Sequence, residues 1–310
     1  TCLCTILEAE KGETTAPQGF RDALACHFYM LYSFMFFLES EAKGSKADAT
    51  VFQIREICAT AMLKAAATMA DCRTTLWKQG VPEESVILLP CRIAYPMLEA
   101  ATGVAARKTA CGDEAVQMIA ISVHNENLLT STTAALMDLM HNFEHMAVIV
   151  AEICDKVADD RLAVEIIREI GRLESEVGVK NVAPFLVFFA ESRPKLMLQN
   201  LSHVLDLLNH DPYSMRSAIV SAISHILVYL GKPQEEQDNT TLDVTKSRAS
   251  LLDLLTERVY DVSSFTRASV LKAWIRLTTT QSIPKDRIVS VATLAMDRLQ
   301  DKTVLVRKQA

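Results

Sequence analysis

Apolar residues recur at helical spacing along most of the chain. The clearest stripe follows the i, i+3, i+4, i+7 rule over four turns, at Met215, Ala218, Ile219, Ala222, Ile223, Ile226, Leu227 and Leu230. Shorter stripes of the same period lie at 163–170, 201–208 and 288–299. Positions three and four apart share one face of an α-helix, so each stripe predicts a helix buried along one side. No series of segments alternates with the period of β-strands. We therefore expect an all-α protein.

Proline and glycine mark the ends of these predicted helices. Nine Gly and nine Pro are few for 310 residues, since average usage would give roughly twenty and fifteen. Four prolines stand where we expect a new helix to start, the position at which the missing N–H costs least: Pro184, Pro194, Pro212 and Pro284. A single helical core of this length would be unusually large, so two domains or a solenoid of short helices is expected.

A repeat appears in the second half of the chain. Segments 209–227, 260–277 and 300–310 can be aligned, because each has an Asp in a turn and an Arg five or six residues later. These pairs are Asp211/Arg216, Asp261/Arg267 and Asp301/Arg307. The arginines are 51 and 40 residues apart, and the longer step contains the polar stretch 231–246. HEAT-type units of two helices run ~40–47 residues, and stacking them buries a core that one unit cannot build.

The turn residues of this repeat are predicted to be structural. Asp in the turn can cap the second helix, and its carboxylate can meet the Arg of the same unit or of the next one. The expected fold is an all-α, HEAT-type helical-hairpin solenoid, an α-α superhelix. Residues 1–175 repeat far less clearly and form an N-terminal helical region, either degenerate repeats or a cap, whereas 176–310 hold the HEAT-type repeats. We place the boundary within 171–178.

The last repeats resemble a known family. A run of the form D-V-x-x-[FY]-x-R-x-x-V-L-x-x-W is present at Asp261, Val262, Phe265, Arg267, Val270, Leu271 and Trp274. A second run, L-x-D-K-x-x-L-V-R-K-x-A, is present at Leu299, Asp301, Lys302, Leu305, Val306, Arg307, Lys308 and Ala310. Segment 258–310 therefore resembles condensin complex subunit 1, the non-SMC HEAT-repeat regulatory subunit. Segment 179–230 is similar to the part just upstream, and 136–147 is more faintly similar.

The resemblance implies a scaffold without catalytic activity or cofactor, in a complex that condenses chromosomes in mitosis. The family's subunit binds the kleisin subunit, can contact the SMC ATPase subunits, and helps the complex hold double-stranded DNA without reading its sequence. The expected location is the nucleus and the chromosome, with the cytoplasm outside mitosis. The chain starts at Thr1 without an initiator Met, and we expect an N-terminal portion of a longer protein. Another HEAT-repeat adaptor, such as a transport receptor, is the alternative.

Charge is unevenly distributed. The whole chain carries −6, yet from Arg258 onward ten basic and four acidic residues give +6, so the other 257 residues carry −12. A basic stretch of this kind is either a solvated helix face with Asp–Arg ladders or a surface for the phosphate backbone of DNA. Arg267 and Arg307 can be tied to turn aspartates, so the candidate DNA contacts are Lys272, Arg276, Lys302 and Lys308.

One motif points to a different function. His141, Glu144 and His145 form H-x-x-E-H, the inverted zinc-protease motif, and on a helix the two histidines would share one face. Zinc catalysis would also need a third ligand and a bound water, and no downstream carboxylate, Glu191 included, is marked for that role. A zinc-dependent hydrolase is thus a second alternative, while the favoured interpretation has no catalytic residue and no metal.

The remaining features favour core packing. The eight cysteines include no C-x-x-C pair, which favours buried free thiols over disulfides or a zinc site. The apolar run 24–38 is shorter than the ~20 residues that a membrane span needs, so we expect a helix buried on most sides. Its aromatic cluster is predicted to be core rather than a groove for a kleisin peptide: Phe28, Tyr29, Tyr32, Phe34, Phe36 and Phe37.

Overall fold

The computed structural model describes most of the chain. The described residues are 18–42, 49–71, 73, 77, 83–123, 126–157, 159–173, 178–210, 212–232 and 241–310. All regular structure within these ranges is helical, which confirms the predicted all-α class. Contacts divide the chain into two compact units. Unit 1 comprises residues 1–139 and 152–162, and unit 2 comprises residues 140–151 and 163–310. The division at 175/176 stays a prediction.

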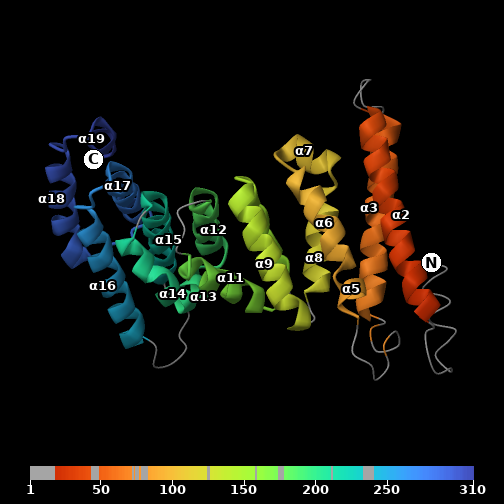
Figure 1. Cartoon of the computed structure of the whole chain (residues 1–310). Helices are drawn as coiled ribbons and strands as arrows, with labels where there is room; N and C mark the ends of the chain where they lie inside the picture. Colours follow the sequence, from red (N-terminus) through yellow and green to blue (C-terminus); the bar gives the residue numbers. More distant parts are fainter. Residues whose placement is uncertain are drawn as a thin grey trace. The chain divides into compact units, whose positions relative to one another are not determined.

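Unit 1 is built from paired helices. They are α2 (Gln18–Ala42), α3 (Ala49–Asp71), α5 (Glu84–Ile87), α6 (Leu89–Glu99), α7 (Val104–Thr109), α8 (Gly112–Ser122) and the first part of α9 (Glu126–Asn142). Helix α2 packs against α3 and α6, and α8 packs against both α3 and α6 (Figure 1). The side chains enclosed between them are apolar and fully buried, among them Ala59, Met62, Leu98, Met118 and Ile119. Helix α10 (Met146–Lys156) contributes residues to each unit, as does α11 (Arg161–Gly171).

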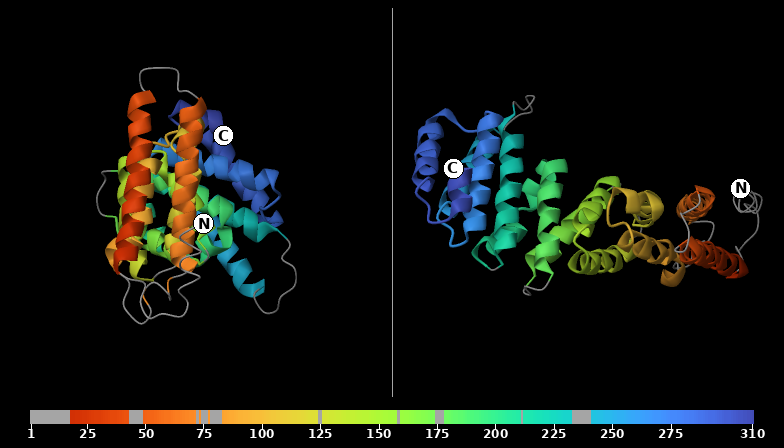
Figure 2. Two further views of the ribbon diagram at one scale, coloured as in Figure 1. Left: turned by 90° about the vertical axis from the view of Figure 1, so that its right-hand side faces the viewer. Right: turned by 90° about the horizontal axis from the view of Figure 1, so that it is seen from above.

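Unit 2 is a stack of helical hairpins. Its elements are α12 (Val179–Ser192), α13 (Pro194–Asn200), α14 (Ser202–Leu205), the 3-10 turn η1 (Asp206–Asn209), α15 (Tyr213–Gly231), α16 (Thr241–Arg258), α17 (Ser264–Thr279), the 3-10 turn η2 (Lys285–Arg287), α18 (Ile288–Arg298) and α19 (Val304–Gln309). Helix α12 packs against α15, α15 against α17, and α17 against α19 (Figures 1 and 2). Helix α16 packs on both α15 and α17. Neighbouring hairpins therefore share one core, as the solenoid prediction requires.

The core of unit 2 is centred on α15. All eight residues of its predicted apolar stripe are buried, and burying each large aliphatic side chain contributes about 1.5–3 kcal/mol. Helix α15 is also long and apolar enough to cross a membrane, but 61% of its apolar window is buried inside unit 2. Its composition is thus accounted for by packing against α12 on one side and α17 on the other.

Two expectations about helix ends and faces are wrong. Pro184 does not start a helix: it lies inside α12, where the burial of Val182, Phe185 and Phe189 offsets the lost backbone hydrogen bond. The stripe at 288–299 is helical but not buried, since no residue of α18 is buried. Pro194 and Pro212 do stand at the starts of α13 and α15.

The aromatic cluster of α2 is mostly exposed, which corrects the prediction of a core helix. Phe28 is 1% exposed and lies on the same face as Leu24 and Met35, which are also buried. Other large apolar side chains of this helix are 45–65% exposed, namely Tyr29, Met30, Phe34, Phe36 and Phe37. Helix α2 therefore packs through one narrow stripe, because among the described helices only α3 and α6 make extensive contact with it.

Gly171, the last residue of α11, lies close to the backbone of His203, and this contact can be tested by substitution. A Cβ atom at this position would clash with the carbonyl oxygen of His203, a backbone atom that cannot rotate away. Gly171→Ala is expected to lower the free energy of unfolding by about 1–3 kcal/mol, the usual cost of overpacking. Thermal and urea unfolding followed by circular dichroism measure this change.

The matched control is Gly103→Ala. Gly103 has extended backbone, and a Cβ atom there would meet nothing within 4 Å. Its substitution should cost clearly less, limited to the small capping difference between Gly and Ala. Equal losses in the two variants would show that the contact between α11 and residue 203 is not as close as described.

Candidate functional site

Two buried ion pairs join successive turns of unit 2. Arg216 on α15 donates from Nε to Asp261 Oδ2 at 3.1 Å and from Nη2 to Oδ1 at 3.3 Å. Arg267 on α17 makes the same fork with Asp301, with both distances 2.9 Å. All four side chains are at most 7% exposed. Each arginine thus pairs with the aspartate of the next repeat.

Each aspartate also holds its own turn. Asp261 Oδ1 accepts the backbone N–H of Ser263 at 2.8 Å, and Asp301 Oδ1 accepts that of Thr303 at 2.9 Å. The Thr303 hydroxyl donates to the same carboxylate at 2.6 Å. Both carboxylates therefore accept hydrogen bonds from two neighbouring repeats at once, which is how a buried charge is compensated.

A third contact recurs in every repeat. The Nη1 group of each arginine donates to the carbonyl oxygen six residues earlier: Arg216 to His210 at 2.8 Å, Arg267 to Asp261 at 2.7 Å, and Arg307 to Asp301 at 2.6 Å. This register aligns His210, not Asp211, with Asp261 and Asp301. Asp211 itself lies outside the described residues.

The environment of Asp301 is strongly anion-stabilising. The Arg267 guanidinium, and next the Thr303 hydroxyl and amide, hold the pKa of this carboxyl well below its usual range, against the opposing effect of burial. Asp301 is therefore ionised in the folded protein at neutral pH. Trp274, another residue of the family run on α17, is 3% exposed and belongs to the core.

Sequence reasoning missed a second arginine of the repeat. Arg258 donates from Nη1 to the Leu208 carbonyl at 2.8 Å and from Nη2 to Asn209 Oδ1 at 3.1 Å. Arg298 lies 5.0 Å from the ring centroid of Tyr260 in a cation–π contact. Each stands three residues before a turn aspartate and reaches back to the preceding turn. The shared spacing R-x-x-D-x-[ST]-x-x-x-R, present at 258–267 and 298–307, would have revealed this second arginine from the sequence.

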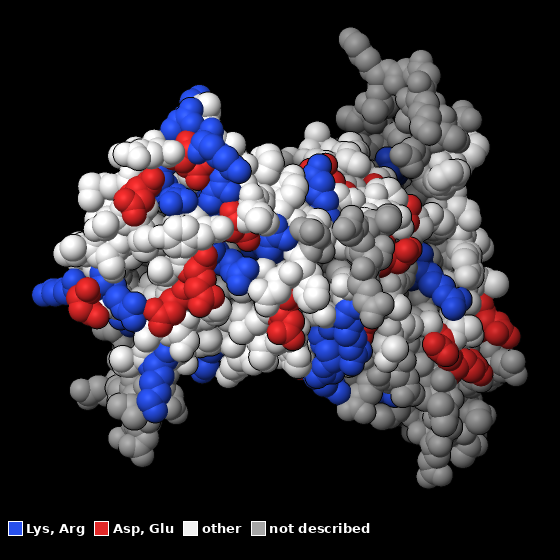
Figure 3. All heavy atoms as spheres, turned by 60° about the vertical axis from the view of Figure 1, so that its left-hand side comes forward, with Lys and Arg blue, Asp and Glu red and all other residues white. Residues whose placement is uncertain are grey.

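The four candidate DNA contacts differ in their surroundings. Lys272 on α17, Lys302 in the turn before α19 and Lys308 on α19 are exposed. Arg276 is exposed too, but its Nη1 group donates to Ser224 Oγ on α15 at 2.6 Å. Figure 3 shows that Lys and Arg side chains gather near the upper left of this face, with Asp and Glu among them. Of this set, the three lysines are exposed and Arg276 is exposed but hydrogen-bonded to Ser224.

The H-x-x-E-H motif does not lie on one helix face, as the zinc alternative would require, because α9 ends at Asn142 and α10 begins at Met146. His141 therefore lies in the last turn of α9, whereas Glu144 and His145 lie in the connecting turn. His145 packs against the Phe143 ring at 5.9 Å, and the His141 ring lies against Gly178. No group of three or more His, Cys, Asp or Glu side chains within the described ranges is placed to hold a metal ion.

The described cysteines are free thiols. Cys58, Cys91, Cys111 and Cys154 are buried and Cys26 is exposed, so the expectation of burial is confirmed for four of them. Burial raises the pKa of Cys91 to about 11 and that of Cys111 to about 11. Because the thiolate is the reactive form, these two side chains are poor nucleophiles at neutral pH. Cys2, Cys4 and Cys72 lie outside the described residues.

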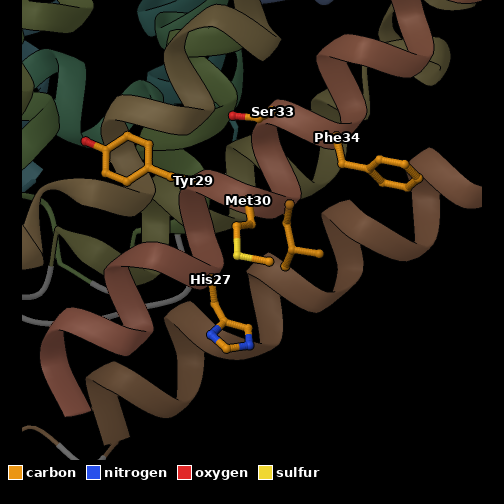
Figure 4. A pocket seen from close by; sticks show the side chains of 6 residues that line it. His27, Tyr29, Met30, Ser33 and Phe34 are labelled. Carbon is orange, nitrogen blue, oxygen red and sulfur yellow. The ribbon is translucent and has the colours of Figure 1, made fainter. Parts of the chain in front are cut away.

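Helix α2 carries an open apolar surface. Its lining side chains are His27, Tyr29, Met30, Leu31, Ser33 and Phe34, which all come from this one helix. His27 and Met30 extend from one side of the helix and Tyr29 from another (Figure 4). Because α2 alone supplies the lining among the described residues, we describe this feature as a shallow surface and not as an enclosed ligand cavity.

Comparison with known proteins gives one consistent result. The chain is 29% identical over 247 residues to condensin complex subunit 1 of Xenopus laevis and 30% identical over 248 residues to that of Mus musculus, in each case over 76% of this chain. It is 31% identical over 208 residues, or 64% of this chain, to the condensin-1 complex subunit CAP-D2 of Arabidopsis thaliana. The chain spans only 15–18% of the length of these relatives. No family model matches the chain. The resemblance predicted from residues 258–310 is confirmed.

Asp301→Asn tests the electrostatic role of the inter-repeat pair. Removing one partner of a buried ion pair should lower the free energy of unfolding by about 3 kcal/mol near neutral pH. Because the pKa of Asp301 is depressed in the folded protein, its stabilisation is present above the unfolded pKa of about 3.9 and is lost as pH falls through the folded pKa.

The measurement is urea unfolding of both proteins between pH 7 and pH 3. The stability gap between wild type and Asp301→Asn should be constant down to about pH 5 and then narrow. Asp297→Asn, an exposed neighbour on α18, is the control and should change stability little at any pH. A gap that widens toward low pH would contradict the assignment.

Proposed function

Because this chain is similar in sequence to one part of condensin complex subunit 1, we propose that it is a non-catalytic scaffold segment of that condensin subunit, acting in mitotic chromosome condensation. The observation that carries the proposal is the match over three quarters of the chain, joined to a stack of helical hairpins in unit 2. In this proposal residues 1–175 form the N-terminal helical region and 176–310 the HEAT-type repeats.

The architecture supports a holding function. Buried pairs between consecutive repeats fix the spacing of the turns in unit 2, so side chains on its surface keep a defined separation. A partner that contacts several repeats then meets a preorganised surface and loses less conformational entropy on binding. We propose that these partners are the kleisin subunit and the SMC ATPase subunits, and that the protein acts in the nucleus on chromosomes, with the cytoplasm as its location outside mitosis.

The first test of this proposal is partner selection. The purified 310-residue chain, immobilised, should retain the kleisin subunit from an equimolar mixture with an importin cargo protein. Retention is measured by quantitative mass spectrometry of the eluate. Retention of the cargo and not of kleisin would favour the alternative, a HEAT-repeat transport adaptor, and would overturn the condensin assignment.

We further propose that unit 2 contacts the phosphate backbone of double-stranded DNA. Support comes from Lys272, Lys302 and Lys308, which are exposed, and from the net charge of +6 between residue 258 and residue 310. The turn aspartates Asp261 and Asp301 are buried and paired, so they screen these lysines little. Arg276 is a weaker candidate, because contact with phosphate competes with its bond to Ser224.

Simultaneous Lys272→Gln, Lys302→Gln and Lys308→Gln substitution should weaken duplex binding for any sequence. If all three lysines neutralise phosphates, the slope of log K against log salt should fall by about 2 to 3. Fluorescence anisotropy of a labelled duplex at 50–200 mM salt measures both quantities.

The matched control neutralises Lys180, Lys195 and Lys232, which are exposed in unit 2 but precede the basic segment. The control has the same net charge as the test variant, so it corrects for the general effect of charge. Identical salt slopes for the two triple variants would end the DNA proposal without touching the scaffold assignment.

A further inference from the structure

A small pocket in unit 1 is lined by residues of α3, α5 and α8. Its walls are apolar, with Ala66, Met69 and Ala70 from α3, Ile87 from α5 and Ile121 from α8. The volume of the pocket is about 140 Å³, and an engineered apolar cavity of about 150 Å³ binds one benzene molecule. The pocket therefore has room for a single large apolar side chain.

The space comes from two small side chains on one face of α3. Ala66 and Ala70 are four residues apart, so they lie one above the other along the helix. Ala66 is 1% exposed and belongs to the floor of the pocket, whereas Ala70 is exposed and belongs to its mouth. Larger residues at these two positions would fill the space, so the sequence of α3 keeps the pocket open.

Trp77 gives the pocket a polar requirement. It lines the pocket and is 8% exposed, yet its Nε1 group has no hydrogen-bond partner among the described residues. The Ser122 hydroxyl, which also lines the pocket, donates to the Met118 carbonyl at 2.7 Å and so has its own partner. Leaving a buried donor unpaired is costly. An occupant that brings an oxygen acceptor would satisfy Trp77.

Arg73 adds a positive charge to the lining. It is exposed, and no ion pair joins it to another described residue. Arginine and tryptophan side chains donate hydrogen bonds and accept none, so Arg73 and Trp77 together select an occupant with acceptor groups. The charge of Arg73 favours a carboxylate as one of them.

We propose that this pocket binds one large apolar side chain, Phe or Leu, of an acidic linear segment in a partner protein. The side chain fills the space that Ala66 leaves, a backbone carbonyl of the segment accepts from Trp77 Nε1, and a neighbouring Asp or Glu pairs with Arg73. Sites for free small ligands usually have volumes of about 300–1,000 Å³. A pocket for one side chain fits a polypeptide that makes its other contacts outside. The DNA contacts proposed for unit 2 involve none of these residues, so the two proposals can fail separately.

The indole group of Trp77 reports directly on occupancy. The whole chain holds two tryptophans, Trp77 and Trp274, so the ¹⁵N-labelled protein gives two indole N–H signals in NMR, which Trp77→Phe assigns. Trp274 is also buried without a partner for Nε1 among the described residues, but it does not line the pocket, so it is the internal control. The end-blocked peptide Asp-Glu-Phe-Glu-Asp should shift the Trp77 signal and leave the Trp274 signal in place.

Variants of the probe test each part of the recognition. Replacing the Phe of the peptide by Ala should weaken binding at least tenfold, because the apolar side chain supplies most of the buried area. Replacing its acidic residues by Lys should weaken binding at least fivefold. The free acid 3-phenylpropionate, which has the ring and one carboxylate, should shift the same signal but bind at least tenfold more weakly than the peptide.

Substitutions at exposed positions test the pocket itself, with circular dichroism as the check that each variant folds. Ala70→Leu fills the mouth and should weaken peptide binding at least tenfold. Arg73→Gln should weaken it by about fivefold, the upper range for an exposed ion pair. Arg92→Gln removes an exposed cation of α6 that does not line the pocket and should leave the affinity unchanged.

Four results would overturn the proposal. The first is a Trp77 signal that neither the peptide nor 3-phenylpropionate moves. The second is peptide binding that survives Ala70→Leu, because the pocket would then not be the site. The third is equal binding of the acidic and the Lys-substituted peptides. The fourth is 3-phenylpropionate that binds as tightly as the peptide, because the site would then serve a free carboxylic acid.

Discussion

The ion pair between an arginine of one repeat and an aspartate of the next governs the architecture of unit 2. Burying two charges is costly, and only good geometry with further hydrogen bonds compensates for it. Arg267 and Asp301 meet this condition, because the guanidinium fork matches both carboxylate oxygens and Thr303 donates to the carboxylate as well. The pair is therefore satisfied in one relative placement of α17 and the following turn.

The apolar core and the buried Arg–Asp pairs between successive repeats, which we call the ladder, make different contributions to the structure of unit 2. Aliphatic stripes such as that of α15 provide most of the burial, but an apolar surface tolerates small displacements of a partner helix because its attraction is non-directional. Hydrogen bonds between Arg216 and Asp261 tolerate displacements of only a few tenths of an ångström. We interpret the ladder as the element that selects one register among several well-buried ones, so that surface residues on successive repeats acquire fixed spacing.

Helix content and repeat length were accessible from sequence because both depend on local patterns. The stripes of α15 and α18 have the same period, yet one is buried and the other exposed. Periodicity reports a face suited to burial, and tertiary neighbours decide whether that face is covered. The aromatic residues of α2 illustrate the same limit, because hydrophobicity alone did not distinguish Phe28 from Phe36. The sequence also left open whether each turn aspartate pairs with the arginine of its own repeat or with that of a neighbouring repeat. Only the distances in the structure decide this.

The direction of the ladder has a consequence for how the chain folds. Each arginine precedes its aspartate by 34 or 45 residues, so during synthesis the cation emerges from the ribosome first and its counter-ion follows. A newly folded layer then ends in an unneutralised guanidinium until the next turn is made. Folding from the N-terminus closes these pairs one after another, while loss of the last hairpin would uncover a single charge at a time. During synthesis the pairs therefore close stepwise, and each one waits for the turn of the following repeat.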